Sequence, residues 1–124
     1  MASITIVAGP NEGDYYPVGK RTMVIGRDEA CPIQIVDSRA SRKHVQIRFD
    51  EATSQHVAMD MRSANGTYIN GRTLVTDTPL VDGDMITVGE SRLAYSTQEF
   101  PDKQSAVNSW KERGQRGKST IAQD

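Results

Sequence analysis

Apolar and polar residues alternate one by one along much of the chain before Phe100, which is the period of a β-strand with one buried face. Residues 44–49 (HVQIRF) and 56–61 (HVAMDM) show this alternation most clearly. Turn-forming residues separate such stretches at intervals of roughly eight to twelve positions, a spacing typical of an all-β sandwich rather than of alternating strands and helices. We expect strands at residues 3–8, 15–18, 22–25, 33–36, 44–49, 56–61, 67–69, 85–88 and 92–96.

The pattern changes after Phe100 and Pro101. Asp102 is a suitable N-cap, and apolar residues recur at helical spacing up to Trp110, before a glycine follows. These features predict a short helix over residues 103–113 that docks on the sandwich through Trp110, followed by a flexible tail. A loosely ordered segment without a helix is the alternative.

Composition fits a single domain with a modest core, since 36% of the 124 residues are apolar and 25% are charged. We expect this domain at residues 1–97, with its motifs within 24–75, and a C-terminal extension at 98–124. The net charge of -1 provides no overall attraction to nucleic acid or to anionic membranes. An anion-binding site therefore requires local clustering of Arg and Lys.

Cys31 is the only cysteine, so no intrachain disulfide can form and a reducing compartment is the natural setting. The N-terminus lacks the basic region and the long apolar run of a signal peptide. We therefore expect a cytoplasmic protein. The two His residues lie in predicted strands without the usual spacing of metal ligands, so we expect no metal and no other cofactor.

Basic and hydroxyl side chains gather in two predicted loops. Arg27 follows Gly26 at the end of a strand, where its guanidinium can bind a carboxylate or a phosphate through two hydrogen bonds. Residues 38–44 (SRASRKH) place the hydroxyl of Ser41 among basic residues, a combination suited to a doubly charged phosphate. A solvated basic turn is the alternative. The basic residues of this second loop are Arg39, Arg42 and Lys43.

Two Asn-Gly pairs lie five positions apart in residues 62–71 (RSANGTYING). Asn-Gly favours tight turns because Gly adopts positive φ freely and Asn tolerates it. We expect the first pair, Asn65-Gly66, to present a carboxamide that both donates and accepts hydrogen bonds. We expect the second pair, Asn70-Gly71, to form a hairpin. Taken alone, each pair indicates only a turn.

Three motifs in this order resemble those of the forkhead-associated (FHA) domain family: Gly-Arg at 26–27, Ser-x-x-His at 41–44 and Ser-x-Asn-Gly-Thr at 63–67. The resemblance covers roughly residues 3–97. It implies a β-sandwich of two twisted, mainly antiparallel sheets with about ten or eleven short strands. In this family, loops at one end of the sandwich bind phosphothreonine peptides.

The resemblance also implies roles for individual residues. Arg27, Ser41 and Arg42 would contact the phosphate, Asn65 would hold the peptide main chain, and Arg39 would lie toward the residues after the phosphothreonine. Ala64 departs from the family pattern, because many members carry a Ser or Thr there that can contact the ligand. The residues expected to shape the loops are Gly26, His44, Gly66, Thr67, Asn70 and Gly71.

The resulting hypothesis is a non-catalytic phosphothreonine-binding adaptor, whose partners are Ser/Thr kinases or their substrates rather than nucleic acid or membranes. An FHA-like scaffold that binds partners or itself without phosphate is the alternative. An enzyme is disfavoured because no nucleophile and base stand at recognisable spacing. Thr120, which follows several basic residues, is a candidate phosphosite whose tethered phosphate could occupy the binding site of the same chain.

Overall fold

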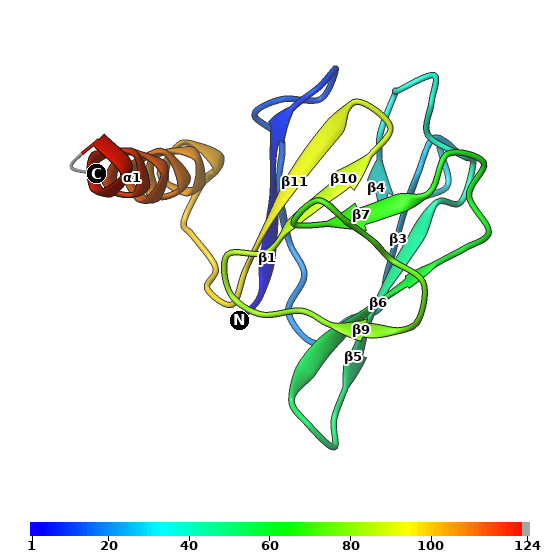
Figure 1. Cartoon of the computed structure of the whole chain (residues 1–124). Helices are drawn as coiled ribbons and strands as arrows, with labels where there is room; N and C mark the ends of the chain where they lie inside the picture. Colours follow the sequence, from blue (N-terminus) through cyan, green and yellow to red (C-terminus); the bar gives the residue numbers. More distant parts are fainter. Residues whose placement is uncertain (123–124) are drawn as a thin grey trace.

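Two β-sheets pack face to face in the computed structural model, which describes the backbone of residues 1–122 and the side chains of residues 1–112 (Figure 1). Within these residues the first sheet has the strand order β2-β1-β11-β10-β7-β8, and the second has the order β4-β3-β5-β6-β9. Neighbouring strands are antiparallel except β3 and β4. The first sheet contains β1 (Ser3–Ala8), β2 (Tyr15–Pro17), β7 (Thr67–Ile69), β8 (Arg72–Thr73), β10 (Met85–Val88) and β11 (Ser91–Ser96). The second contains β3 (Met23–Gly26), β4 (Ile33–Gln34), β5 (Val45–Asp50), β6 (Gln55–Asp60) and β9 (Thr78–Pro79).

This arrangement confirms the all-β sandwich expected from the sequence. The strands with one-by-one alternation form close to their predicted positions. Sequence analysis missed β8 and β9, because each has only two residues and no alternation can be detected over that length. β5 begins at Val45, so His44 lies just before the strand rather than within it.

The core lies between the two sheets and is built mainly from isoleucines that point inward from alternate strand positions. Ile4 and Ile6 of β1 face Ile47 of β5 across the sandwich core, and all three side chains are 0% exposed. Burial of each such side chain contributes about 1.5–3 kcal/mol. The side chain of Thr5, between them, points to the opposite, outer face of the sheet, because successive side chains of a strand alternate.

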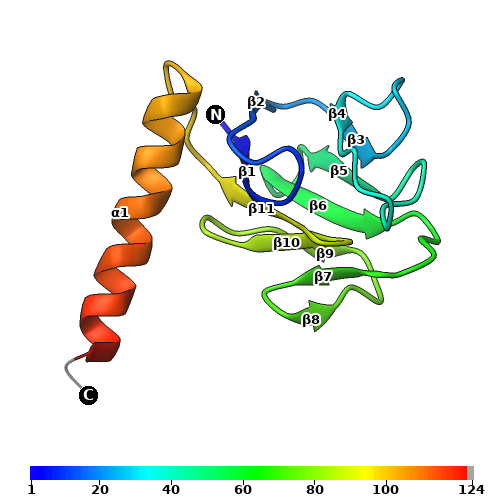
Figure 2. The same ribbon diagram turned by 90° about the horizontal axis from the view of Figure 1, so that it is seen from above.

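The helix of the described residues, α1 (Lys103–Ala122), follows β11 and lies beside the first sheet (Figure 2). The carboxylate of Asp102 accepts a hydrogen bond from the backbone N–H of Ser105 at 2.8 Å, so Asp102 caps the helix. The helix continues past the end predicted at residue 113. A glycine inside a helix costs only about 1 kcal/mol relative to alanine, so Gly114 does not force the helix to stop.

Trp110 is half-buried and lies against the first sheet, in a cavity shared with β1 and β11. No helix in the described part of the chain is both long enough and apolar enough to cross a membrane. Thr120, the candidate phosphosite, lies outside the residues whose side chains the structure describes.

Replacement of Ile47 by alanine should lower the free energy of unfolding by about 2–5 kcal/mol, because it leaves a cavity in a fully buried part of the core. The matched control is Val75→Ala, which truncates a side chain that is 83% exposed and should change stability by less than about 0.5 kcal/mol. Urea unfolding followed by far-ultraviolet circular dichroism measures both values. Equal losses in the two variants would contradict this core assignment.

Candidate functional site

Three loops meet at the end of the sandwich that lies away from the β5–β6 turn (Figure 1). They are the β3–β4 loop (27–32), the β4–β5 loop (35–44) and the β6–β7 loop (61–66). The backbone N–H of Arg27 donates to the carbonyl of Ser41 at 3.0 Å, which joins the first loop to the second. The side chain of Asn65 donates to the carbonyl of Arg39 at 2.8 Å, which joins the third loop to the second. Residues far apart in the sequence are thereby brought into one site.

Gly26 allows the close approach of the β3 end and the β4–β5 loop. A Cβ atom on Gly26 would lie 2.1 Å from the carbonyl oxygen of Arg42, and this backbone atom cannot move aside without shifting the loop. The next residue, Arg27, donates from its Nε to the carbonyl of Ala40 at 3.0 Å. This bond orients the guanidinium, whose Nη groups donate no hydrogen bond within the described residues and remain free for a ligand.

Ser41 lies at the junction of the loops with its hydroxyl in a defined position. Its Oγ accepts a hydrogen bond from the backbone N–H of Ala64 at 2.9 Å. This bond uses an oxygen lone pair, so the O–H of Ser41 stays available to donate to an anion. Ala64 therefore contributes its backbone to the site, although its methyl group cannot reach a ligand through a hydrogen bond.

His44 connects the second loop to the third through its buried side chain. The side chain is 0% exposed, its Nδ1 accepts from the backbone N–H of Ser41 at 3.0 Å, and its Nε2 lies 2.8 Å from the carbonyl oxygen of Gly66. These partners require a neutral ring with its proton on Nε2, since Nδ1 acts as the acceptor. The ring of His44 thus joins the two loops.

Thr67 and Asp60 hold the base of the β6–β7 loop. Thr67 is fully buried and its hydroxyl donates to the Asp60 carboxylate at 2.7 Å. The same carboxylate accepts from the hydroxyl of Ser63 at 2.5 Å and from its N–H at 3.1 Å. Burial alone would raise the pKa of Asp60, but the hydrogen bonds from Ser63 and Thr67 outweigh it and leave that pKa below its ordinary value.

Asp37 is a loop-organising residue that sequence analysis did not identify. Its side chain is 3% exposed and accepts hydrogen bonds from the N–H of Arg39 at 2.9 Å, from the N–H of Glu90 at 2.8 Å and from the hydroxyl of Ser91 at 3.0 Å. Burial raises the pKa of Asp37, but these hydrogen bonds outweigh the effect of burial and leave that pKa below its ordinary value. Asp37 therefore fixes the β4–β5 loop to the first sheet.

The two Asn-Gly pairs differ in conformation and in place. At the second pair, Asn70 and Gly71 both have positive φ, 52° and 81°, and they close the β7–β8 hairpin as a type I′ turn. At the first pair only Gly66 has positive φ, 80°, so this turn has a different geometry. Asn65 of the first pair lies at the site, whereas the second pair lies in the hairpin and contacts the start of β10 instead.

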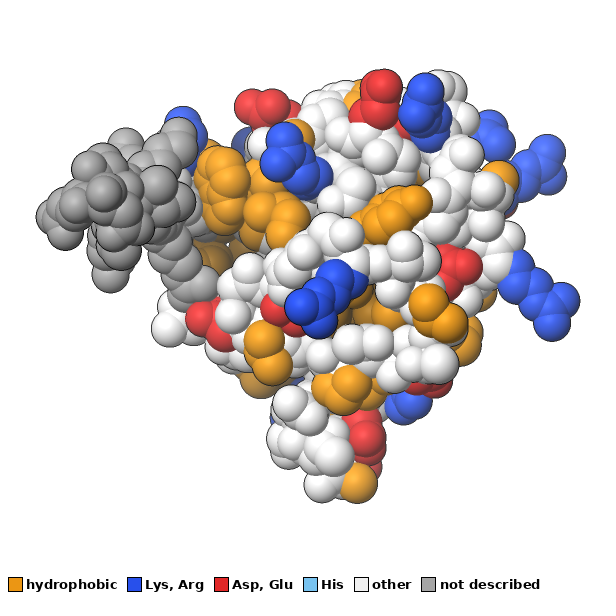
Figure 3. Space-filling view, viewed as in Figure 1, with side chains coloured by type: hydrophobic (Ala, Val, Ile, Leu, Met, Phe, Trp, Pro, Cys, Tyr) orange, Lys and Arg blue, Asp and Glu red, His pale blue; other side chains and the backbone are white. Residues whose placement is uncertain are grey.

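The exposed surface of the site is locally positive. The salt bridge found among the described residues joins Arg48 to Asp77 at 3.4 Å. The cations of the site therefore form no salt bridge with a described residue. Arg27 and Arg42 line an open depression together with Asp28 and Glu29. Lys and Arg side chains project from this side of the molecule in the space-filling view (Figure 3). The other exposed cations of these loops are Arg39, Lys43 and Arg62.

The arrangement suits a phosphate monoester on a peptide rather than a metal ion. Free guanidinium N–H groups, a free hydroxyl and a carboxamide are donors for phosphate oxygens and for peptide groups. No group of three or more His, Cys, Asp or Glu side chains within the described residues is placed to hold a metal.

Comparison with known proteins agrees with this geometry. A family model for the FHA domain matches residues 23–89. Glycogen accumulation regulator GarA of Mycolicibacterium smegmatis is 33% identical over 96 residues, which cover 77% of this chain and 59% of that protein. An oxoglutarate dehydrogenase inhibitor of Corynebacterium jeikeium is 32% identical over 94 residues, covering 76% of this chain and 63% of that protein. The matched segment thus spans about three-fifths of these relatives.

A solved structure from a study of phosphothreonine-dependent FHA domain interactions superposes with a TM-score of 0.69. Its sequence is 26% identical, and the match covers 80% of this chain and 98% of that one. The similarity therefore spans the sandwich and the loops of the site together.

Replacement of Asp37 by asparagine should lower the free energy of unfolding at pH 7 by about 1–3 kcal/mol, because an amide cannot accept all three hydrogen bonds. The folded-state pKa of Asp37 lies below its ordinary value of 3.8, so the carboxylate stabilises the fold above about pH 4. This contribution is lost as the pH falls through the lower, folded-state pKa. The difference between wild type and variant should therefore narrow on acidification below about pH 4.

Urea unfolding at a series of pH values measures this difference. Asp77→Asn is the matched control, because it removes a carboxylate that is 49% exposed and should change stability by less than about 1 kcal/mol. A difference between wild type and Asp37→Asn that stays constant down to pH 2.5 would show that the Asp37 carboxylate does not contribute in this way.

Proposed function

The chain belongs to the FHA domain family, and we propose that it binds phosphothreonine peptides as a module without catalytic activity. FHA domains bind such peptides, and the observation that carries the proposal is the convergence of Arg27, Ser41 and Asn65 from three loops. Each of these side chains has hydrogen-bonding groups left over after the contacts that position it. The site is therefore organised before a ligand arrives, which reduces the entropic cost of binding.

Arg27 and Ser41 are proposed to bind the phosphate group directly. The Nε of Arg27 is occupied by the carbonyl of Ala40, which leaves its Nη groups to bind two phosphate oxygens. The O–H of Ser41 donates to a further oxygen. Arg42, an exposed cation on the same depression, adds a third contact. Hydrogen bonds of this charge-assisted kind contribute about 1.5–3 kcal/mol each.

Asn65 is proposed to hold the main chain of the peptide beside the phosphothreonine. Its Nδ2 already donates to the carbonyl of Arg39, which leaves the Oδ1 atom to accept from a peptide N–H. Because that bond also fixes the backbone at Arg39, the exposed guanidinium of Arg39 can lie toward the residues after the phosphothreonine. Ala64 cannot supply the ligand contact that a Ser or Thr hydroxyl would make, so peptide binding depends more heavily on the other residues of the proposed site.

A purely binding role is supported by the state of the groups that catalysis would need. Both ring nitrogens of His44 are occupied by backbone groups, so the ring cannot act as a base without opening the loops. Cys31 is 8% exposed and its thiol donates to the carbonyl of Arg42 at 3.2 Å. Burial raises the pKa of this thiol, and Asp28 raises it further, which disfavours the reactive thiolate.

We propose that the ligands are segments of proteins phosphorylated by Ser/Thr kinases, and that the chain acts as an adaptor in the cytoplasm. A free, buried cysteine fits a reducing compartment. An FHA scaffold that binds partners without phosphate is the competing function, and the following experiments separate the two.

Arg27→Ala should weaken binding of a degenerate phosphothreonine peptide set by about 10- to 100-fold, because the phosphate loses its two charge-assisted hydrogen bonds. Arg92→Ala is the matched control, since it removes an exposed arginine on β11 outside the three loops and should leave binding unchanged. Isothermal titration calorimetry with phosphorylated and unphosphorylated peptides measures both. Equal affinity for the unphosphorylated set would favour the phosphate-independent scaffold.

Ser41→Ala should weaken the same binding by at least about tenfold, because it removes the O–H donor and also the acceptor that positions the Ala64 backbone. Ser38→Ala changes an exposed serine in the same loop and should have little effect. Fluorescence anisotropy with a labelled phosphothreonine peptide compares the two variants. Similar affinities for both would remove Ser41 from the proposed site.

A further inference from the structure

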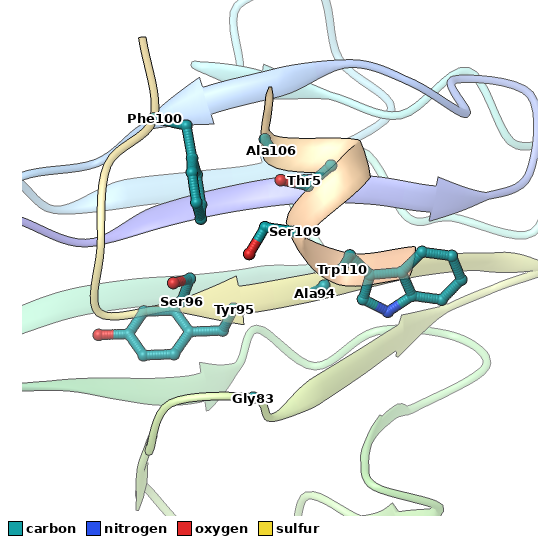
Figure 4. A pocket seen from close by; sticks show the side chains of 9 residues that line it. All are labelled: Thr5, Gly83, Ala94, Tyr95, Ser96, Phe100, Ala106, Ser109 and Trp110. Atoms are coloured by element: carbon teal, nitrogen blue, oxygen red, sulfur yellow. The ribbon is translucent and has the colours of Figure 1, made fainter. Parts of the chain in front are cut away.

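A buried histidine joins the two sheets at the end of the sandwich that carries the β5–β6 turn, away from the proposed phosphate site (Figure 1). His56 belongs to β6 of the second sheet and is 2% exposed. Its Nδ1 lies 2.9 Å from the hydroxyl of Tyr95, which belongs to β11 of the first sheet. Ala94 and Ser96 line the cavity beside α1, and alternation along the strand turns the buried Tyr95 ring the other way, toward the core (Figure 4). This His56–Tyr95 pair therefore spans the core.

The second ring nitrogen of His56 has no partner. Among the side chains that the structure describes, Nε2 of His56 is the buried nitrogen or oxygen atom that makes no hydrogen bond. The carbonyls of Gly19 and Arg21, in the β2–β3 loop (18–22), lie near the ring, but neither accepts a hydrogen bond from Nε2. A proton on Nε2 therefore has no acceptor, and a lone pair there has no donor. In either tautomer, one hydrogen bond holds the neutral ring.

Uncharged and cationic groups face the ring from the neighbouring elements. On β5, the ring of Phe49 packs edge-on against that of His56, with the ring centroids 5.2 Å apart. The ammonium group of Lys20, from the β2–β3 loop, lies 5.9 Å from the centre of the Phe49 ring. Lys20, Met1 and the uncharged Ser54 help to line a cavity of about 190 Å³ beside His56. The amino groups of Lys20 and Met1 oppose a further positive charge, and His56 takes part in no salt bridge with a described residue.

The acids near the pair act on Tyr95 rather than on His56. Burial, and then Asp82 and Asp84, raise the pKa of the Tyr95 hydroxyl to about 12, so this group stays neutral near pH 7. Burial lowers the pKa of His56 below its ordinary value of 6.5, and the two loop carbonyls oppose this only in part. A proton on His56 therefore creates a buried charge without a partner of opposite charge.

We propose that the His56–Tyr95 pair is a pH-sensitive switch, which holds the two sheets and the β2–β3 loop together while His56 is neutral. Once the ring takes up a proton, its charge must be hydrated, and the adjoining cavity gives water access to it when the β2–β3 loop moves outward. Mild acid thus opens this end of the sandwich. The proposal does not depend on the phosphopeptide role, because neither residue lies in the three loops of that site.

Urea unfolding of the full chain between about pH 7.5 and about pH 5 tests the linkage. Because the folded-state pKa of His56 lies below 6.5, the unfolded chain takes up the proton first as the pH falls. Below about pH 6.5 the equilibrium constant for unfolding of the wild type should therefore rise more steeply than that of His56→Gln, by up to about tenfold for each pH unit. Glutamine can still bond Tyr95 but takes up no proton in this range. His56→Phe, which keeps a ring, replaces His56→Gln if the latter does not fold.

Tyr95→Phe is the matched control, because it removes the hydroxyl that bonds His56 and keeps the titrating ring. This variant should be less stable than the wild type at every pH and should keep the steep pH dependence that His56→Gln loses. His44 is present in all of these variants, so any titration of His44 cancels in the comparison.

Amide hydrogen exchange followed by NMR separates local opening from a general loss of stability. The N–H groups of Val18 and Gly19 donate to the carbonyl of Ala2 at 2.9 and 3.0 Å, so their exchange reports on the β2–β3 loop. After correction for the intrinsic exchange rate, their protection in the wild type should fall at least about tenfold more than that of β10 between about pH 7.5 and about pH 5.5. The loop of His56→Gln should keep its protection.

The proposal fails if the NMR signals of the His56 ring in the folded wild type titrate at or above pH 6.5, because protonation would then not oppose folding. It fails equally if the stability of the wild type and of His56→Gln changes in parallel down to about pH 5. Protection lost to the same extent in β10 and in the β2–β3 loop would show that no local opening takes place.

Discussion

Both ring nitrogens of His44 are occupied by backbone groups from two different loops, and the geometry of the binding end follows from this contact. The bond from the N–H of Ser41 fixes one loop, and the bond to the carbonyl of Gly66 fixes the other. Because the ring is fully buried, neither bond can be replaced by water. Protonation would convert Nδ1 from an acceptor into a donor and would break the contact with Ser41. A neutral imidazole is therefore a condition for the arrangement of both loops.

The carboxylates of Asp37 and Asp60 also hold these two loops in place. Asp37 ties the β4–β5 loop to Glu90 and to Ser91 at the start of β11, and Asp60 ties the β6–β7 loop to the end of β6. Each accepts at least three hydrogen bonds, so each remains charged in a largely buried position. Short polar loops have few apolar contacts of their own, and these buried charges hold them in place instead. The loops that carry the exposed donors of Arg27 and Ser41 are thus held by carboxylates that lie outside the proposed set of ligand contacts.

Local sequence patterns predicted the strands and turns whose conformation is set by neighbouring residues. Alternation located the long strands, and the Asn70-Gly71 pair located a hairpin whose positive φ angles require those residue types. The three loop motifs indicated the candidate site through their resemblance to a family, and hydrogen bonds between the loops that carry Arg27, Ser41 and Asn65 bring these loops together.

Contacts between distant residues could not be predicted in the same way. Asp37 binds Glu90 and Ser91, which lie more than fifty positions away, and an aspartate in a polar loop gives no sign of such partners. Asp60 stood at the end of a predicted strand as an ordinary polar residue, although Ser63 and Thr67 surround its carboxylate. The end of α1 was also misplaced, because the modest helix penalty of a glycine does not decide where a helix stops.

The proposed recognition of phosphate at this site depends on where the charges lie rather than on the net charge of the chain. The chain has a net charge of -1, and Asp28 and Glu29 lie beside Arg27 and Arg42 in the same depression. These acids weaken the positive potential at distances beyond about 8 Å, where salt already screens it at physiological ionic strength. A polyanion such as nucleic acid therefore gains little from the surface as a whole. A phosphate monoester that reaches the donors of Arg27 and Ser41 gains short, directed hydrogen bonds, and this difference favours a phosphorylated side chain over general anionic surfaces.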